Sequence, residues 1–598
     1  MSGKQLINKV DEIVDEALLG LTITYPALEL LKEQRVVLMP HWSESDEVGV
    51  ISGGGSGHEP FAAGFVGKGM LTAAVCGSVF ASPPTSNIFH AIEKICTHKK
   101  AGCLVIIPNY TGDCLNFGLA IERARLSGLK IEQIVFGDDC SIPDEKLSIA
   151  GKRALPGIVL AIKVAGSLAA MGKDLDEIYK HVKLVADNIA SCSVGLVPCT
   201  MFGQKEAMFR IPDDEVVFGQ GIHGEDGYEK KKLSSASKTA SHLIDRIEKA
   251  LKLDDTSSST SKLVVLVNNF GSLTQLELQI IVKEVNVQLR KRGVEVLRVY
   301  SGHLMTSLNS VGVHLSVLRL PESDSEAFSM ILEALDQPTQ APGWTGCEYS
   351  LETSSTESSP PRNVMTAEPS KKIDSLAGPT LTSRQQGLLK RCLVEACRAV
   401  INEERTINEL DSGCGDADCG STHRSLAEGI LSALEALALA RPASLMTELA
   451  GIAENRMGGT SGAIYSLLFT AAAQEMAKVE VVCNWLQVWL GAWRAGVEVL
   501  KRYSRARIGD KTLIDVIEPC LIELLRKNYS SYVDAAKFLM DCIQMYAEKT
   551  KTLEPKAGRA SYVTDPEHRG KIDAGAYAVA QWMRAVAQTL KEDFHLAN

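Results

Sequence analysis

The chain has 598 residues, 45% of them hydrophobic and 23% charged, a balance typical of soluble globular proteins with several folding units. Its net charge of −10 gives no electrostatic support for binding to nucleic acid. We expect no membrane segment, because the longest apolar stretches are interrupted early, as Lys163 interrupts GIVLAIKVAGSLAAMG, and no apolar leader opens the N-terminus. The 15 cysteines show no module spacing, which favours reduced thiols and the cytosol.

Residues 1–336 alternate β-like runs with helical patterns, which predicts an α/β unit. The alternation occurs in two series, so we expect two subdomains, about 1–195 and 196–336. The runs that read as strands are 47–52, 103–109, 131–137, 262–273, 295–302 and 314–320, and the helical patterns are 114–127 and 274–292.

The composition changes over residues 337–380, where Ser, Thr, Pro and Glu dominate. Such a segment cannot bury enough apolar surface to offset the entropy of ordering, so we expect a flexible linker. After it, apolar residues recur at helical spacing from Leu388 to Ile401, and similar stripes continue to the end. The predicted fold class is therefore multidomain, with an N-terminal α/β domain of two subdomains and then an all-α domain over 381–598.

Two glycine-rich segments of the α/β unit each carry a histidine. SGGGSGHEP (52–60) follows a predicted strand, and its glycines would let backbone N–H groups approach a small, oxygen-rich ligand, with His58 at the end of the loop. It is not a P-loop, because no Gly-Lys-Ser/Thr follows at the required spacing. GQGIHGEDG (219–227) surrounds His223 with glycines and acids. A tight turn and a solvent-exposed turn histidine remain the plain alternatives.

The segment NYTGDCLNFG (109–118) also follows a predicted strand. Asp113 therefore lies at the carboxyl edge of a sheet, where open α/β folds bind ligands. The same aspartate is equally well placed to cap the next helix. Both interpretations of Asp113 stay open.

An acidic loop in the predicted helical domain, DSGCGDADCGSTH, suggests a metal site. Asp411, Asp416 and Asp418 would repel one another unless they are solvated or bind cations. Hard oxygen ligands favour Mg²⁺, whereas an EF-hand fits poorly because Gly420 occupies its third acidic position. The alternative is a solvated acidic loop.

A second loop of small residues, RMGGTSGAIY (456–465), opens a predicted helix. Backbone amides from Gly458 to Ser461 would hold phosphates at that N-terminus, unless the loop is only a helix–helix turn. Arg559 in KAGRASYV would offset phosphate charge. Together with the acidic loop, these features favour a metal–nucleotide site.

Taken in chain order, SGGGSGHEP, NYTGD, GIHGE, GDADCGSTH, MGGTSG and GRASY resemble the motifs of the dihydroxyacetone kinase family, over nearly the whole chain apart from the linker. The resemblance implies a first domain that binds a triose and a helical-barrel domain that binds ATP with Mg²⁺. It also implies that His223 bonds to the substrate carbonyl as a hemiaminal, that His58 hydrogen-bonds the substrate, and that Asp113 is the base on the attacking hydroxyl.

The resemblance carries further roles to the matching motif positions. The implied substrate-binding residues are Gly54, Gly55, Ser56, Gly57, Ser82 and Asn109. The implied metal ligands are Asp411, Asp416 and Asp418. The implied nucleotide-binding residues are Cys419, Ser421, Thr422, His423, Gly458, Gly459, Thr460, Ser461, Arg559 and Asp573.

The implied activity is ATP-dependent phosphorylation of dihydroxyacetone or glyceraldehyde, with glycerol rejected because a hemiaminal requires a carbonyl. The layout is similar to that of animal members, which implies a second reaction that splits FAD into AMP and cyclic FMN with Mn²⁺ or Co²⁺. Because the triose and nucleotide sites lie in different domains, the domains must meet. The family implies a cytosolic homodimer for this purpose.

The sequence departs from the family pattern near these sites. Pro108 stands where a lysine usually precedes the Asn of NYTGD, and Ala417 replaces a glycine of GDGD. If position 417 needs a positive φ, alanine costs about 1 kcal/mol or more there. These changes motivate an alternative, a protein that kept the fold, lost efficient catalysis and acts in ligand binding or regulation.

Overall fold

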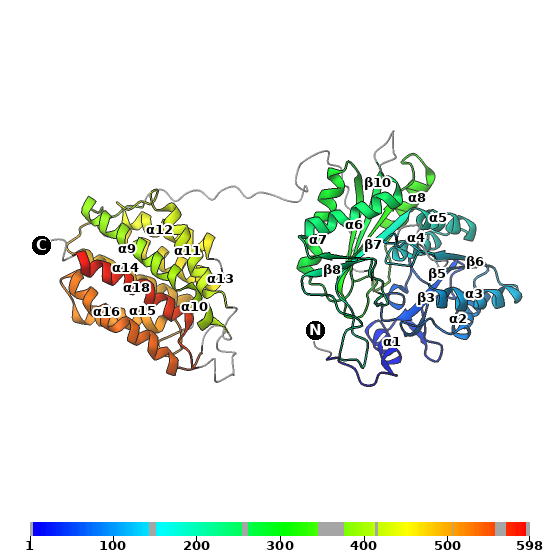
Figure 1. Ribbon diagram of the computed structural model, residues 1–598, viewed down its shortest axis with the longest axis horizontal. Helices are drawn as coiled ribbons and strands as arrows, with labels where there is room; N and C mark the ends of the chain where they lie inside the picture. The colour runs from blue at the N-terminus through cyan, green and yellow to red at the C-terminus, as the bar shows by residue number, and fades with distance from the viewer. Residues whose placement is uncertain are drawn as a thin grey trace. The chain divides into compact units, whose positions relative to one another are not determined.

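The computed structural model divides into two units, residues 1–364 and 365–598, which are described separately (Figure 1). No helix in the described part of the chain is both long and apolar enough to cross a membrane. The structure describes residues 4–142, 151–225, 227–253, 261–344, 376–412, 417–457, 459–504, 506–556 and 570–593.

The first unit begins with a sheet in the order β1-β2-β4-β3-β5-β6, in which β3 to β6 run parallel and β1 and β2 are antiparallel at one edge. Every residue of β3 and β5 is buried, as expected for parallel strands covered on both faces. The strands are β1 Glu29–Leu31, β2 Val36–Leu38, β3 Gly49–Ser56, β4 Ala73–Val79, β5 Cys103–Pro108 and β6 Ile131–Phe136. The helices are α1 Ile13–Thr24, η1 Ala63–Phe65, α2 Thr85–His98, α3 Thr111–Leu126, α4 Ile158–Ala170 and α5 Leu175–Asp187.

A second sheet follows in the order β11-β10-β12-β7-β8-β9, in which β10 and β11 are parallel and the other pairs antiparallel. Residue 195, where the sequence placed the boundary between the subdomains, lies inside β7, so the second sheet begins earlier in the chain than expected. The strands are β7 Ile189–Val197, β8 Glu215–Phe218, β9 Glu229–Lys232, β10 Lys262–Asn269, β11 Glu295–Gly302 and β12 Val311–Arg319. The helices are α6 Ala236–Leu251, α7 Gln275–Lys291 and α8 Glu326–Asp336.

Helix α4 is the apolar stretch that Lys163 interrupts, and all its residues from 158 to 169 are buried. The Lys163 ammonium donates to Ser167 Oγ at 2.6 Å and to the carbonyl oxygens of Ala334 and Gln337 at 2.8 Å. These two carbonyls lie at the C-terminal end of α8, where a positive charge is favourable. The buried lysine therefore joins α4 to α8.

The chain continues past α8 onto the core of the first unit. Ala341 and Trp344 are buried there, and the Gly343 N–H donates to the Gly64 carbonyl at 2.7 Å. Residues 338–344 therefore belong to the first unit, although the composition led us to expect a linker from residue 337 onward. Residues 345–375 of the expected linker (337–380) lie outside the described residues.

All the named secondary-structure elements in the described residues of the second unit are helices, which confirms the all-α domain expected from the sequence. Its core is formed by the facing apolar sides of these helices. The helices are α9 Ser383–Asn402, α10 Glu404–Asp411, α11 Cys419–Ala433, α12 Pro442–Arg456, α13 Gly459–Ala477, α14 Trp485–Tyr503, α15 Ile514–Lys527, α16 Tyr532–Lys549, η4 Thr550–Thr552 and α18 Ala574–Asp593.

The sequence predicts reduced cysteines, and the structure agrees for all but one pair of those it describes. Cys96 of α2 and Cys103 of β5 are joined in a disulfide. The other 11 cysteines that the structure describes carry free thiols.

Candidate functional site

Residues expected to bind substrate lie at the carboxyl ends of three parallel strands in the first sheet. His58 follows β3, Ser82 follows β4, and Asp113 lies in the first turn of α3, just after β5. The β8–β9 loop of the second sheet brings His223 to the same place, with its ring centroid 4.8 Å from that of His58. The two subdomains therefore form this site together.

His58 is buried and presents a hydrogen-bond acceptor to the site. Its Nδ1 lies 2.9 Å from the Thr306 carbonyl oxygen, which only accepts, so Nδ1 carries the proton and Nε2 carries a lone pair. That Nε2 atom is buried and has no partner among the described residues. Burial, aided by the nearby His223, lowers the pKa of His58 to about 3, so the ring stays neutral.

His223 is oriented by Glu225. The His223 backbone N–H donates to Glu225 Oε2 at 2.9 Å, and its Nδ1 lies 3.4 Å from Oε1. Burial opposes ionisation of Glu225, but the hydrogen bond from His223 and the charge of Arg153 hold the pKa of Glu225 at about 2. An ionised carboxylate beside Nδ1 favours a proton on that nitrogen, which leaves the Nε2 lone pair available as a nucleophile.

Asp113 does not cap α3, since no side-chain cap bond is formed at that helix start, and its Oδ1 is buried without a partner in the described structure. Burial raises the pKa of Asp113 to about 6. The Ser82 hydroxyl lies near enough to oppose this rise, as does His223, yet it makes no hydrogen bond of ordinary geometry with the carboxylate. A Cβ at Gly54 would lie 3.9 Å from Asp113 Oδ1, so the glycine loop borders this acid.

The other predicted substrate-binding residues mainly shape the loop. A Cβ at Gly55 would lie 2.7 Å from the Ala81 nitrogen, and one at Gly57, where φ is +99°, would lie 2.8 Å from the Phe80 ring. The Ser56 hydroxyl donates to the Gly77 carbonyl at 2.8 Å. The Asn109 amide donates to the Lys152 carbonyl at 2.7 Å, so these two side chains hold neighbouring segments in place.

Residues that the sequence interpretation missed complete the enclosure. Phe80 stacks on His58 with centroids 5.0 Å apart, and the Tyr110 ring meets His223 at 4.5 Å. Arg153 donates to Asp139 and to the Gly219 carbonyl at 2.8 Å, at the start of the loop that carries His223. Tyr110 could have been predicted as a site residue, because it lies within the motif NYTGD. Phe80 and Arg153 could not, because their contacts join segments that are far apart in the sequence.

In the second unit, the acidic loop connects α10 to α11. Asp411 Oδ2 accepts the backbone N–H groups of Asp418 at 3.1 Å and Cys419 at 3.3 Å, so Asp411 holds the start of α11. Ala417 has a φ of +60°, the left-handed conformation considered from the sequence. Asp416 lies outside the described residues.

Asp573 lies at the start of α18, near this loop. Its Oδ1 accepts the Ala576 N–H at 2.7 Å. Burial raises the pKa of Asp573 to about 6, with Lys511 opposing and the negative charges of Asp515 and Asp411 adding to the rise. This excess of carboxylates fits a hard cation such as Mg²⁺, although no three potential ligands converge on one point within the described ranges, which omit Asp416.

The other described residues that the sequence predicts to bind nucleotide lie at the starts of α11 and α13. The Ser421 hydroxyl donates to Glu404 Oε1 and accepts from the Asn408 amide, both at 3.0 Å, and the Thr422 N–H donates to the Asp418 carbonyl at 2.9 Å. The His423 Nδ1 donates to the Cys419 carbonyl at 2.7 Å. The other residues of this group that are described are Gly459, with a φ of +52°, Thr460 and Ser461, whereas Gly458 and Arg559 lie outside the described residues.

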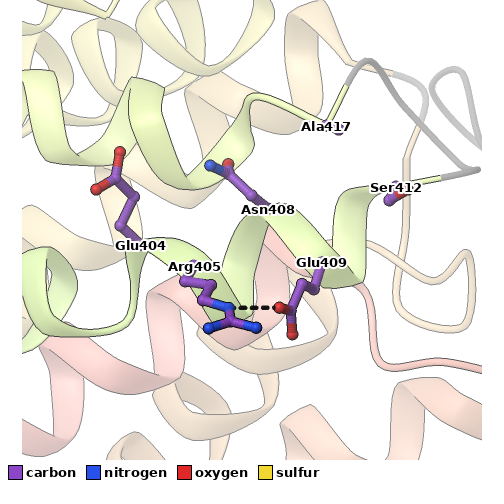
Figure 2. Close-up of a pocket in the computed structure, with 6 residues that line it drawn as sticks. All are labelled: Glu404, Arg405, Asn408, Glu409, Ser412 and Ala417. Atoms are coloured by element: carbon purple, nitrogen blue, oxygen red, sulfur yellow. Dashed lines mark hydrogen bonds and ion pairs between the residues drawn. The ribbon is translucent and has the colours of Figure 1, made fainter.

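A cavity of about 390 Å³ borders both ends of the acidic loop (Figure 2). Its charged groups are largely paired, since Arg405 donates to Glu409 at 2.7 Å and Glu404 accepts from Arg424 at 2.8 Å. A ligand held there would touch the acidic loop on either side. The lining residues are Glu404, Arg405, Asn408, Glu409, Ser412 and Ala417.

Two family models match this chain, the Dak1 domain over residues 19–343 and the DAK2 domain over residues 398–588. Triokinase/FMN cyclase from Homo sapiens is 37% identical over 598 residues, 99% of this chain and 100% of the relative. A putative 3,4-dihydroxy-2-butanone kinase from Solanum lycopersicum is 36% identical, and the alignment covers 100% of this chain and 99% of the relative. The crystal structure of the dihydroxyacetone kinase from C. freundii in complex with AMP-PNP and Mg²⁺ is 30% identical, with a TM-score of 0.64, and covers 98% of this chain and 100% of its own. The chain therefore belongs to the dihydroxyacetone kinase family.

Proposed function

We propose that this protein transfers a phosphoryl group from ATP to a hydroxyl of a short carbonyl compound, dihydroxyacetone or glyceraldehyde. The names of the relatives support the reaction class, since they include triokinase and dihydroxyacetone kinase over the full chain length. The observation that carries the proposal is the convergence of His223, His58 and the buried Asp113 on one place in the first unit.

His223 is proposed to capture the carbonyl group. Its Nε2 lone pair forms a C–N bond to the carbonyl carbon as the C=O π bond breaks, and the carbonyl oxygen takes up a proton from solvent to give a hemiaminal. The ionised Glu225 beside Nδ1 stabilises the positive charge that bond formation places on the imidazole. His58 Nε2, a neutral acceptor, then binds a hydroxyl of the captured substrate.

Asp113 is proposed to take the proton of the hydroxyl that attacks the phosphorus atom. A raised pKa of about 6 brings this acid closer to neutral pH and makes it a stronger base than an ordinary aspartate. A positioned base of this kind contributes about 10²–10⁴-fold to the rate.

The second unit is proposed to bind ATP through Asp411, Asp416 and Asp418 and through the N-terminus of α13. Mg²⁺ bound with ATP supplies neutralisation of the phosphate charge. The exposed start of α13, with Thr460 and the left-handed Gly459, directs backbone N–H groups outward to phosphate oxygens. Because triose and nucleotide sites lie in different units, we propose a homodimer in the cytosol in which the two kinds of unit meet.

The human relative's name also includes FMN cyclase, which favours a second reaction for this chain. We propose that the second unit cleaves FAD to AMP and cyclic FMN with Mn²⁺ or Co²⁺. Fluorescence and chromatography of FAD incubated with each metal would test this reaction separately from the kinase.

The primary test is ADP release by the purified chain with ATP and Mg²⁺, comparing dihydroxyacetone, glyceraldehyde and glycerol. We expect turnover with the two carbonyl compounds and none with glycerol, and loss of turnover in His223→Ala. Absence of turnover with every triose would overturn the kinase and favour the alternative, a ligand-binding or regulatory protein that Pro108 and Ala417 have weakened.

A further inference from the structure

One face of the second sheet carries a buried polar stripe beneath the loop of His223. Along β7 and β12, alternate residues such as Val194 and Leu315 enter the apolar core with α6 and α7. The residues between them face the other way and are buried; Ile189 and Leu318 at one end of this face are apolar, and the following residues are polar or glycine. In register across the two strands, the pairs are Ser191 with Ser316, Ser193 with His314, and Gly195 with Gly312.

The loop that carries His223 is attached to this stripe. The Gly219 N–H donates to the Ser193 carbonyl at 2.9 Å, and the Ser193 hydroxyl donates to the Gln220 carbonyl at 2.7 Å. The Gln220 side chain lies over Gly195, where a Cβ would come within 1.8 Å of Gln220 Oε1. The glycine at 195 therefore makes room for a polar side chain three residues before His223.

His314 presents a proton donor on the same face. Asn268 Oδ1 accepts the backbone N–H groups of Leu304 and Met305, so the other end of this amide is the donor to His314 Nδ1, at 3.0 Å. Because Nδ1 accepts, Nε2 carries the proton. The segment that fixes Asn268 continues into Thr306, which binds His58.

Gln220 and His314 hold complementary groups without partners. Both side chains are completely buried, and neither Gln220 amide atom nor His314 Nε2 has a partner among the described residues. Buried polar groups are almost always hydrogen-bonded, and an internal water molecule is the usual bridge when two of them do not touch. The same volume filled by apolar side chains would avoid this cost.

We propose that Gln220 and His314 are positioning residues for His223, joined through one internal water molecule between Gln220 Oε1 and His314 Nε2–H. This bridge fixes the start of the loop relative to the segment that holds His58, and so sets where His223 Nε2 meets the carbonyl. The inference rests on the proposed hemiaminal. It adds a support that acts through His223 and does not touch the substrate.

The test uses the full chain with [2-¹³C]dihydroxyacetone, whose labelled carbon changes from a ketone to a tetrahedral NMR signal in the hemiaminal. We expect Gln220→Met and His314→Leu each to lower hemiaminal formation and raise the KM for dihydroxyacetone by about tenfold or more, with the KM for ATP unchanged. His314→Gln, which keeps a donor near the Nε2 position, should recover most of the loss. The double variant should lose no more than the worse single variant, because both act through one bridge.

Ser316→Ala, on the same stripe, is the matched control and should leave hemiaminal formation unchanged. Gly195→Ala displaces the Gln220 side chain without removing a polar group, so it should reproduce the loss of hemiaminal formation expected in Gln220→Met. It serves as a second test if one of the other variants fails to fold. Two outcomes would overturn this inference but leave the proposed function intact. Either Gln220→Met forms the hemiaminal as well as the wild-type chain does, or His314→Gln forms no more of it than His314→Leu. No hemiaminal in the wild-type chain would overturn the proposed capture by His223 as well.

Discussion

Asp113→Asn should stabilise the protein while it removes activity. The pKa of Asp113 is about 6 in the folded protein, against an ordinary value of 3.8, so folding places the charged form in an unfavourable environment. Each pKa unit corresponds to about 1.4 kcal/mol, which makes this burden on the order of 3 kcal/mol at neutral pH. Asparagine keeps the shape without the charge, so we expect a gain of about 1–3 kcal/mol in the free energy of unfolding.

The pH dependence fixes the sign of this effect. Because the folded pKa lies above the unfolded value, the stability contributed by protonated Asp113 is fully present below pH 3.8 and is lost as the pH rises through about 6. The advantage of Asp113→Asn should therefore be largest at pH 7 and above and should shrink toward pH 4. Urea unfolding at several pH values, without substrate, measures it. Asp139→Asn is the contrasting control, since Asp139 is paired with Arg153 at 2.7 Å and its loss should destabilise.

Activity should respond in the opposite direction. In the wild-type chain, kcat/KM for dihydroxyacetone should fall below about pH 6 as Asp113 is protonated. Asp113→Asn should lose about 10²–10⁴-fold in kcat and lose this acidic limb. An Asp113→Asn variant that is less stable than wild type at pH 8, or that keeps nearly full turnover, would refute the assignment of Asp113 as a buried base.

Three further predictions concern other positions. Ala417→Gly should raise the free energy of unfolding by about 1 kcal/mol in urea melts, because glycine adopts the φ of +60° without strain, and an unchanged midpoint would contradict this. Pro108→Lys should move the acidic limb of kcat/KM to lower pH, since Pro108 and Asp113 both border Gly54 and a nearby ammonium lowers the pKa of a carboxylate. A large gain in kcat at neutral pH would instead favour the weakened-kinase alternative. Lys163→Met should cost about 2–4 kcal/mol, because it leaves the Ala334 and Gln337 carbonyls without their buried donor, whereas Lys173→Met at a surface pair with Glu177 should change little.

Local patterns in the sequence were sufficient to locate most of the regular structure. The run 295–302 is β11 and the helical pattern 274–292 contains α7, because period and punctuation act over a few residues. Composition was less reliable at the unit boundary. Residues 338–344 are poor in strand or helix signals, yet Ala341 and Trp344 are buried in the core of the first unit, and only long-range packing decides that.

The candidate site shows the same division between local and distant information. The motifs located His58, Asp113 and His223, but they left open whether Asp113 caps a helix or enters a pocket. The structure favours the pocket, since the carboxylate is buried next to the glycine loop and its Oδ1 makes no hydrogen bond in the described structure. The contacts of Phe80, Arg153 and Gln220 could not be predicted, because each joins segments that are far apart in the sequence.

In the described structure, buried side-chain atoms without a protein partner are concentrated at the proposed triose site. Of the 12 buried side-chain atoms without a partner in the described structure, six belong to His58, Ser82, Asp113, Gln220 and His314. Packing alone would select apolar side chains at such positions, since a buried polar group that neither protein, water nor ligand satisfies costs about 1–3 kcal/mol. His58 and Asp113 lie beside His223, and Gln220 lies in the loop that carries it, so a shared chemical task explains these buried polar side chains better than independent packing defects do.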